Sequence, residues 1–100
     1  MNTKLKDENM DELFKAILTL ETVDECYAFF EDLCTIKELK AISQRMQVAK
    51  MLVQKKVYSS IVEETGASTA TISRVNRTLS YGSDGYALVF DRMNNGENSK

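Results

Sequence analysis

Apolar residues recur at three- and four-residue steps along nearly the whole chain, a period typical of α-helices. In the first third, one such stripe predicts a helix over about residues 7–20, and a second predicts a helix over about 23–33. Either Thr22 or Asp24 is suited to cap the second of these helices. The first third of the chain is therefore expected to form two amphipathic helices.

A third and longer helix is predicted in the middle of the chain. Thr35 and Glu38 have the spacing of a capping box, in which the two residues satisfy each other's backbone N–H groups. Apolar residues then continue at helical steps as far as Val53, so the helix is expected to end near Gln54 or Lys55. At roughly 20 residues it would span about 30 Å, the diameter of a small domain.

Two further helices are predicted on either side of a glycine turn. A short helix over about 58–65 stops at Gly66, since glycine adopts a left-handed turn without steric cost. Ser68 is then expected to cap a helix over about 69–79. Two helices joined by a tight glycine turn form a helix-turn-helix, which presents its second helix to the major groove of DNA.

The ends of the chain complete an all-α prediction. Residues 86–93 are expected to form a short closing helix, although a strand fits the same residues. Residues 1–6 and 94–100 are polar and are predicted to be frayed tails. One hundred residues make one domain and are too few for two, so 1–100 is predicted to be a single helical domain.

The composition argues against an enzyme and against a membrane protein. The chain has no histidine, which removes the commonest general base and the commonest metal ligand. No apolar run approaches the ~20 residues of a membrane span, and the N-terminus lacks the pattern of a secretory signal. Cys26 and Cys34 are predicted to be reduced and buried, as is the aromatic cluster around them, which indicates a cytoplasmic protein.

Charge is distributed unevenly along the chain. Residues 1–32 contain three lysines and nine acidic residues, a balance of −6 within a net charge of −2. Residues 35–79 contain eight lysines and arginines and three glutamates, a balance of +5. A basic centre of this kind indicates either a positive face for an anionic partner or simply solvated helix faces.

The predicted second helix of the helix-turn-helix has the residue types that DNA recognition requires. Small hydroxyl and methyl side chains let the backbone approach base edges and phosphates, and arginines add positive charge. The predicted DNA-binding residues are Tyr58, Ser59, Ser60, Ser68, Thr69, Ala70, Thr71, Ser73, Arg74 and Arg77. The alternative is a helical protein-interaction or oligomerisation module that does not bind DNA.

Several of these segments also resemble a known family. They are Gly66-Ala67, the Ala-Thr-Ile-Ser-Arg run at 70–74, Leu79, the stretch 38–45 and the Tyr-Gly-Ser-Asp-Gly-Tyr loop at 81–86. Over about residues 10–93 the chain resembles the Trp repressor family, most closely its YerC/YecD branch. The resemblance implies an intertwined, all-helical homodimer that binds double-stranded DNA as a transcriptional regulator.

The resemblance also implies a small-molecule effector. Two arginines hold tryptophan in the family, and their matches here are Arg45 and Arg74, with Thr78 near the position of the amino group. Val75 stands where the family has glycine, and its side chain would occupy part of the indole pocket. Tryptophan and another small effector therefore both stay open. Alternatively, Arg45 forms a helix salt bridge or a dimer contact and Arg74 contacts a phosphate.

Overall fold

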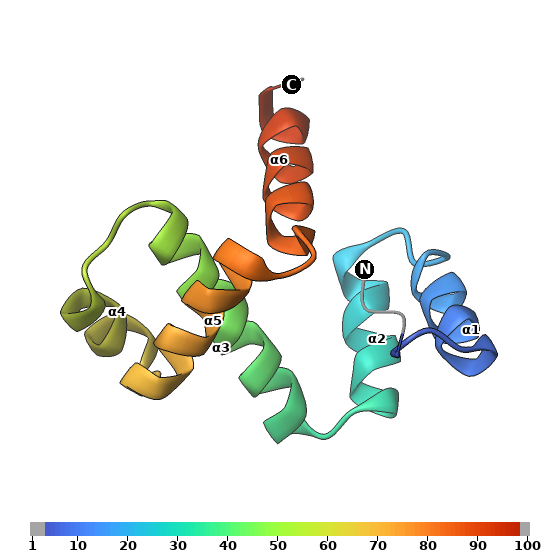
Figure 1. Cartoon of the computed structure of the whole chain (residues 1–100). Helices are drawn as coiled ribbons and strands as arrows, with labels where there is room; N and C mark the ends of the chain where they lie inside the picture. Colours follow the sequence, from blue (N-terminus) through green and yellow to red (C-terminus); the bar gives the residue numbers. More distant parts are fainter. Residues whose placement is uncertain (1–3, 99–100) are drawn as a thin grey trace. The chain divides into compact units, whose positions relative to one another are not determined.

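The computed structural model describes residues 4–98, and all regular secondary structure in this range is helical. The six helices are α1 (Glu8–Ile17), α2 (Val23–Leu33), α3 (Ile36–Val53), α4 (Tyr58–Thr65), α5 (Thr69–Tyr81) and α6 (Gly85–Asn98) (Figure 1). The predicted all-α fold class is therefore confirmed. Contacts divide the chain into two compact units, Met1–Lys40 and Ala41–Lys100, and their grouping into one domain stays a prediction.

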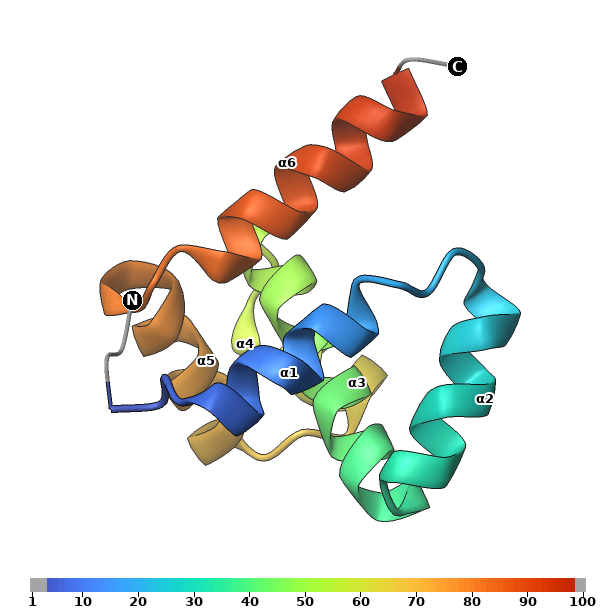
Figure 2. The same ribbon diagram turned by 90° about the vertical axis from the view of Figure 1, so that its right-hand side faces the viewer.

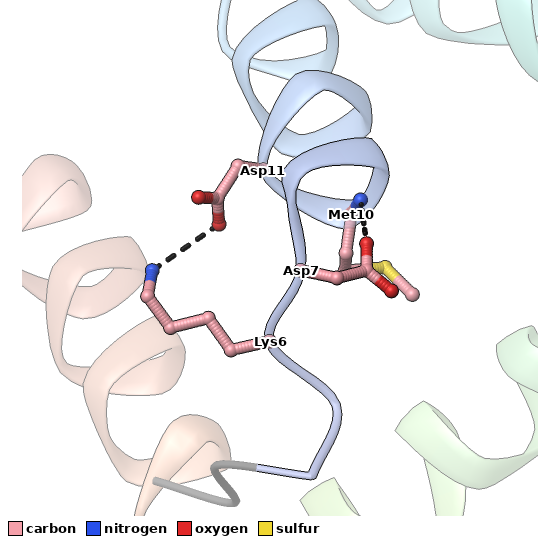
Figure 3. A network of polar contacts seen from close by, with 4 residues as sticks. All are labelled: Lys6, Asp7, Met10 and Asp11. Atoms are coloured by element: carbon pink, nitrogen blue, oxygen red, sulfur yellow. Dashed lines mark hydrogen bonds and ion pairs between the residues drawn. The ribbon is translucent and has the colours of Figure 1, made fainter.

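Side-chain caps define the beginning of α1. Asp7 is the N-cap, and its Oδ1 accepts a hydrogen bond of 2.7 Å from the backbone N–H of Met10 (Figure 3). Lys6 forms an ion pair of 3.2 Å with Asp11, so this residue of the predicted N-terminal tail is tied to the helix. The helix ends at Ile17, earlier than predicted, because Thr19 closes a tighter turn by bonding the Ala16 carbonyl with both its N–H and its hydroxyl.

The capping box predicted at the start of α3 is present. The Thr35 Oγ1 accepts from the Glu38 N–H at 3.1 Å, and the Glu38 carboxylate accepts from the Thr35 N–H at 2.9 Å. These hydrogen bonds favour the charged carboxylate, so they hold the pKa of Glu38 below its ordinary value of 4.5. Local sequence chemistry alone therefore determines where α3 begins.

Among residues 4–40, no side chain is buried. Tyr27 is 65% exposed and Cys26 is also exposed, while Cys34, Phe29 and Phe30 are half-buried. Both cysteines are free, as predicted, but the prediction that they and the aromatic cluster are buried is wrong. Two amphipathic helices present two apolar faces, and within these residues neither face obtains a complete cover.

The second unit has a compact core that positions α4 and α5. Val48, Ala49 and Met51 of α3 contribute one side of it, and the other side comes from Ile61 of α4, Ala67 of the turn, and Ile72 and Val75 of α5. Tyr86 and Phe90 of α6 pack against the same cluster with their rings stacked at 6.1 Å. The glycine turn is thus fixed on a rigid apolar base.

Helix α6 is longer than the sequence indicates. Residues 94–98, predicted as part of a frayed tail, are helical, which corrects that prediction. The segment contains no proline, and Asn95 donates to the Asp91 carboxylate one turn earlier at 3.4 Å, so nothing in it ends the helix at Met93. The second half of α6 points away from α4 and α5 in both views (Figures 1 and 2). None of the helices described has both the length and the apolar character to span a membrane.

Candidate nucleic-acid interface

Gly66 forms the turn between α4 and α5 by adopting a left-handed conformation. Its φ angle is 72°, and its N–H donates to the Val62 carbonyl at 2.9 Å, which caps α4. A Cβ atom built at this position would have no neighbour within 4 Å. Glycine is therefore required here by backbone conformation and not by lack of space.

Hydrogen bonds around Thr65 lock the rest of the turn. The Thr65 hydroxyl donates to the Ile61 carbonyl at 2.7 Å and accepts from the Ala67 N–H at 3.1 Å. The Gln44 side chain, which extends from α3, donates to the Thr65 carbonyl at 3.1 Å. Gln44 was not singled out from the sequence, because a polar residue on a long helix carries no signal that it faces a turn 21 residues further along.

Ser68 caps α5 as predicted. Its hydroxyl oxygen accepts from the Thr71 N–H at 3.1 Å, and its proton is donated to the Thr71 hydroxyl oxygen, also at 3.1 Å. The cap fixes the first turn of α5. The positive end of this helix, where three or four N–H groups lack helical partners, is thus preserved beside exposed side chains.

Helix α5 has one apolar face and one polar face. Ile72 and Val75 are 0% and 3% exposed and form the inner face. The opposite face carries five exposed side chains from the predicted DNA-binding set: Thr69, Ala70, Ser73, Arg74 and Arg77. Four of them, Ala70, Ser73, Arg74 and Arg77, line a shallow surface concavity of about 260 Å³.

The structure separates the remaining predicted residues. Tyr58 and Ser59 are exposed on the first turn of α4, whereas Ser60 is half-buried. Thr71 is also half-buried and does not line the concavity with its neighbours, because the Ser68 hydroxyl engages it. Polarity alone did not show that one hydroxyl of the first α5 turn belongs to a different environment from the others.

The three predicted effector-binding residues come together at a second cavity. Arg45, Arg74 and Thr78 line a space of about 220 Å³ with Ala41, Gln44, Thr71, Val75 and Tyr86. Within residues 4–98, neither Arg45 nor Arg74 takes part in an ion pair, so the helix salt bridge considered for Arg45 is not what the structure has. The Thr78 hydroxyl donates to the Arg74 carbonyl at 3.1 Å, which leaves it only lone pairs to offer a ligand.

Comparison with known proteins agrees with this geometry. The family model of the Trp repressor protein matches residues 8–94. The chain belongs to the Trp repressor family. It is 52% identical over 90 residues to YerC of Bacillus subtilis (strain 168), a match that covers 90% of this chain and 86% of YerC. This places it with the YerC type of Trp repressor-like proteins, as the sequence motifs indicated.

Solved structures of Trp repressor-like proteins have the same fold as this family member. A crystal structure of a Trp repressor candidate from Staphylococcus aureus is 57% identical, covers 94% of this chain and 95% of its own, and gives a TM-score of 0.90. A Trp repressor-like protein from Eubacterium eligens is 58% identical, covers 93% and 96% of the two chains, and gives the same TM-score. The family is one of regulatory DNA-binding proteins and not of enzymes, so the prediction that the chain is not an enzyme is confirmed.

Proposed function

We propose that this protein is a cytoplasmic transcriptional regulator that binds specific sequences of double-stranded DNA as a homodimer. The observation that carries the proposal is the exposed polar face of α5, backed by a buried apolar face. Arg74 and Arg77 on that face have no carboxylate partner within residues 4–98, so their charge is available to phosphates or bases.

The exposed face divides into readers and anchors. Thr69, Ala70 and Ser73 are small enough for α5 to approach base edges, where methyl and hydroxyl groups distinguish bases. Arg74 and Arg77 bind phosphates or guanine, and Ser68 places the helix N-terminus against a phosphate. The side chains at the start of α4, namely Tyr58, Ser59 and Ser60, contact the DNA backbone. Thr71 supports this surface by holding Ser68.

A homodimer explains the apolar surface that the chain leaves exposed. Only seven side chains are buried among the described residues, a small core for 100 residues. Leu18, Val23 and Ile36 are 83%, 72% and 73% exposed, and an apolar groove of about 240 Å³ lies between α3 and α6. A second copy that covers these surfaces would intertwine with the first and would place two copies of α5 on half-sites about 34 Å apart.

We also propose that the cavity lined by Arg45, Arg74 and Thr78 receives a small effector. Two guanidiniums without carboxylate partners and several hydroxyl groups form a built set of ligand donors and acceptors. Tryptophan and other small molecules are both compatible with this proposal. Val75, which stands in the cavity wall where the family has glycine, is the residue that decides whether an indole ring fits.

Selection from a library of random duplexes tests the regulator proposal. Wild-type protein is expected to enrich a pseudo-palindromic site. Arg77→Gln should then weaken binding to all sequences and lower the slope of log K against log salt by about 1 per arginine lost. Arg92→Gln, the same change of charge on α6, is the control and should leave the slope unchanged. A selection that enriches no site would overturn the proposal and favour a helical interaction module.

A further inference from the structure

Arg74 lies between two different spaces on the surface of the second unit. It lines the concavity on the exposed face of α5 together with Ser73 and Arg77, and it also lines the cavity that contains Arg45 and Tyr86. No other residue lines both spaces. A single guanidinium is therefore within reach of the proposed DNA surface and of the proposed effector.

The lining of the cavity is suited to an anion. It holds two arginines and no acidic residue, and Arg45 is half-buried without an ion-pair partner in the described part of the chain. A partly buried cation without a counter-charge is unfavourable, and a bound anion removes that cost. The Thr71 hydroxyl accepts from Ser68, so its own proton is free to be donated into the cavity.

The same lining is poorly suited to a large ring. Sites for apolar ligands are built mainly from hydrophobic and aromatic side chains. Here six of the eight lining residues are polar, and only Ala41 and Val75 are aliphatic. A compact ligand that carries a carboxylate or a phosphate group matches this wall better than an indole does.

From these observations, and on the basis of the proposed DNA-binding function, we propose that the cavity binds a small carboxylate- or phosphate-bearing molecule and that this ligand and DNA exclude each other. The bound anion engages Arg74 and neutralises the charge that a DNA phosphate would otherwise meet. Because coupling between two sites is reciprocal, DNA also weakens the binding of the anion. The effector would therefore release the protein from DNA.

The test measures both sites separately, with inorganic phosphate and citrate as probes at constant ionic strength. For the free protein, at least one probe should raise the melting temperature, because a ligand that binds only the folded state stabilises it. Arg45→Gln should abolish this shift, Arg45→Lys should retain part of it, and Arg77→Gln should leave it unchanged. Absence of a shift with both probes would overturn the anion site.

The second measurement uses fluorescence anisotropy with the selected duplex. The probe that raises the melting temperature should weaken DNA binding by the wild type by about fivefold per protomer, the effect of one lost phosphate contact near 0.15 M salt. The DNA affinity of Arg45→Gln should not respond to that probe, which separates the cavity from general anion effects. Unchanged or tighter DNA binding by the wild type would overturn the exclusion. A protein that binds no duplex at all would overturn the regulator proposal and the exclusion together, while the melting shift still decides the anion site.

Discussion

At the scale of single residues, Gly66 is a position where backbone conformation alone selects the amino acid. Its φ of 72° lies in the left-handed region, and a Cβ there would meet no neighbour. We predict that Gly66→Ala lowers the free energy of unfolding by about 1 kcal/mol, the cost of forcing an L side chain into that region. Urea denaturation measures this change.

The matched control for Gly66 is Gly85, which also has open space around its missing Cβ but no positive φ. Gly85→Ala should leave the free energy of unfolding unchanged or slightly higher, since alanine favours the helix that begins there. Equal losses in the two variants would show that the turn does not depend on the left-handed conformation.

Glu38 is predicted to make the start of α3 sensitive to acid. Its pKa is lowered in the folded state by the hydrogen bonds from Thr35, so its contribution to stability is present above about pH 4.5 and is lost as the pH falls through the lowered pKa. Glutamine can accept the same hydrogen bond without titrating. The stability difference between wild type and Glu38→Gln should therefore shrink as the pH falls below 4.5, as followed by denaturation at a series of pH values. A difference that does not change with pH would contradict the capping role of the carboxylate.

At the scale of elements, the caps and turns were the features that the sequence predicted best. The bounds of α2 and α4 were predicted correctly, because Thr22, Gly66 and Ser68 are strong local signals. The end of α6 was not, since a polar segment without proline can remain helical or fray with little difference in free energy. Local chemistry determines helix ends only where a side chain competes for the backbone.

The candidate site was predicted in composition but not in its division into two spaces. The predicted exposed side chains and the predicted cavity residues are present on one helix, α5. Thr71 and Gln44 took their places only in the structure, because the direction of a polar side chain depends on how α5 and α3 pack. Sequence polarity does not contain that information.

Ser68 provides a test of α5 that separates folding from DNA binding. Aspartate is as good an N-cap as serine, so Ser68→Asp should retain the free energy of unfolding, whereas Ser68→Ala should lose about 1 kcal/mol. If the N-terminus of α5 meets a phosphate, the added negative charge of Ser68→Asp should weaken DNA binding markedly.

The control for this charge is Thr22→Asp at the N-cap of α2, which adds the same charge to a helix with no proposed DNA contact. Its DNA affinity, measured by fluorescence anisotropy, should equal that of the wild type. A Ser68→Asp protein that binds DNA as tightly as Thr22→Asp would show that the start of α5 does not approach the DNA backbone.

At the scale of the whole molecule, the exposed apolar side chains of the first unit call for a partner. In a monomer, Tyr27→Ser would change a residue that is 65% exposed and would have little effect. In the proposed homodimer it should weaken association, which analytical ultracentrifugation would detect. Wild type should sediment with about twice the 11.3 kDa mass of one chain, and Glu31→Ser on the same helix should retain that mass. A wild-type mass of one chain at micromolar concentration would remove the dimer from the account.

The central claim is that the polar faces of two α5 helices enter the major groove of one duplex. Hydroxyl-radical footprinting of the selected duplex with bound wild-type protein tests it most directly. The account predicts two protected segments whose centres lie about 10 base pairs apart, one helical turn, on the same face of the DNA. A single protected segment, or two segments on opposite faces of the duplex, would contradict it.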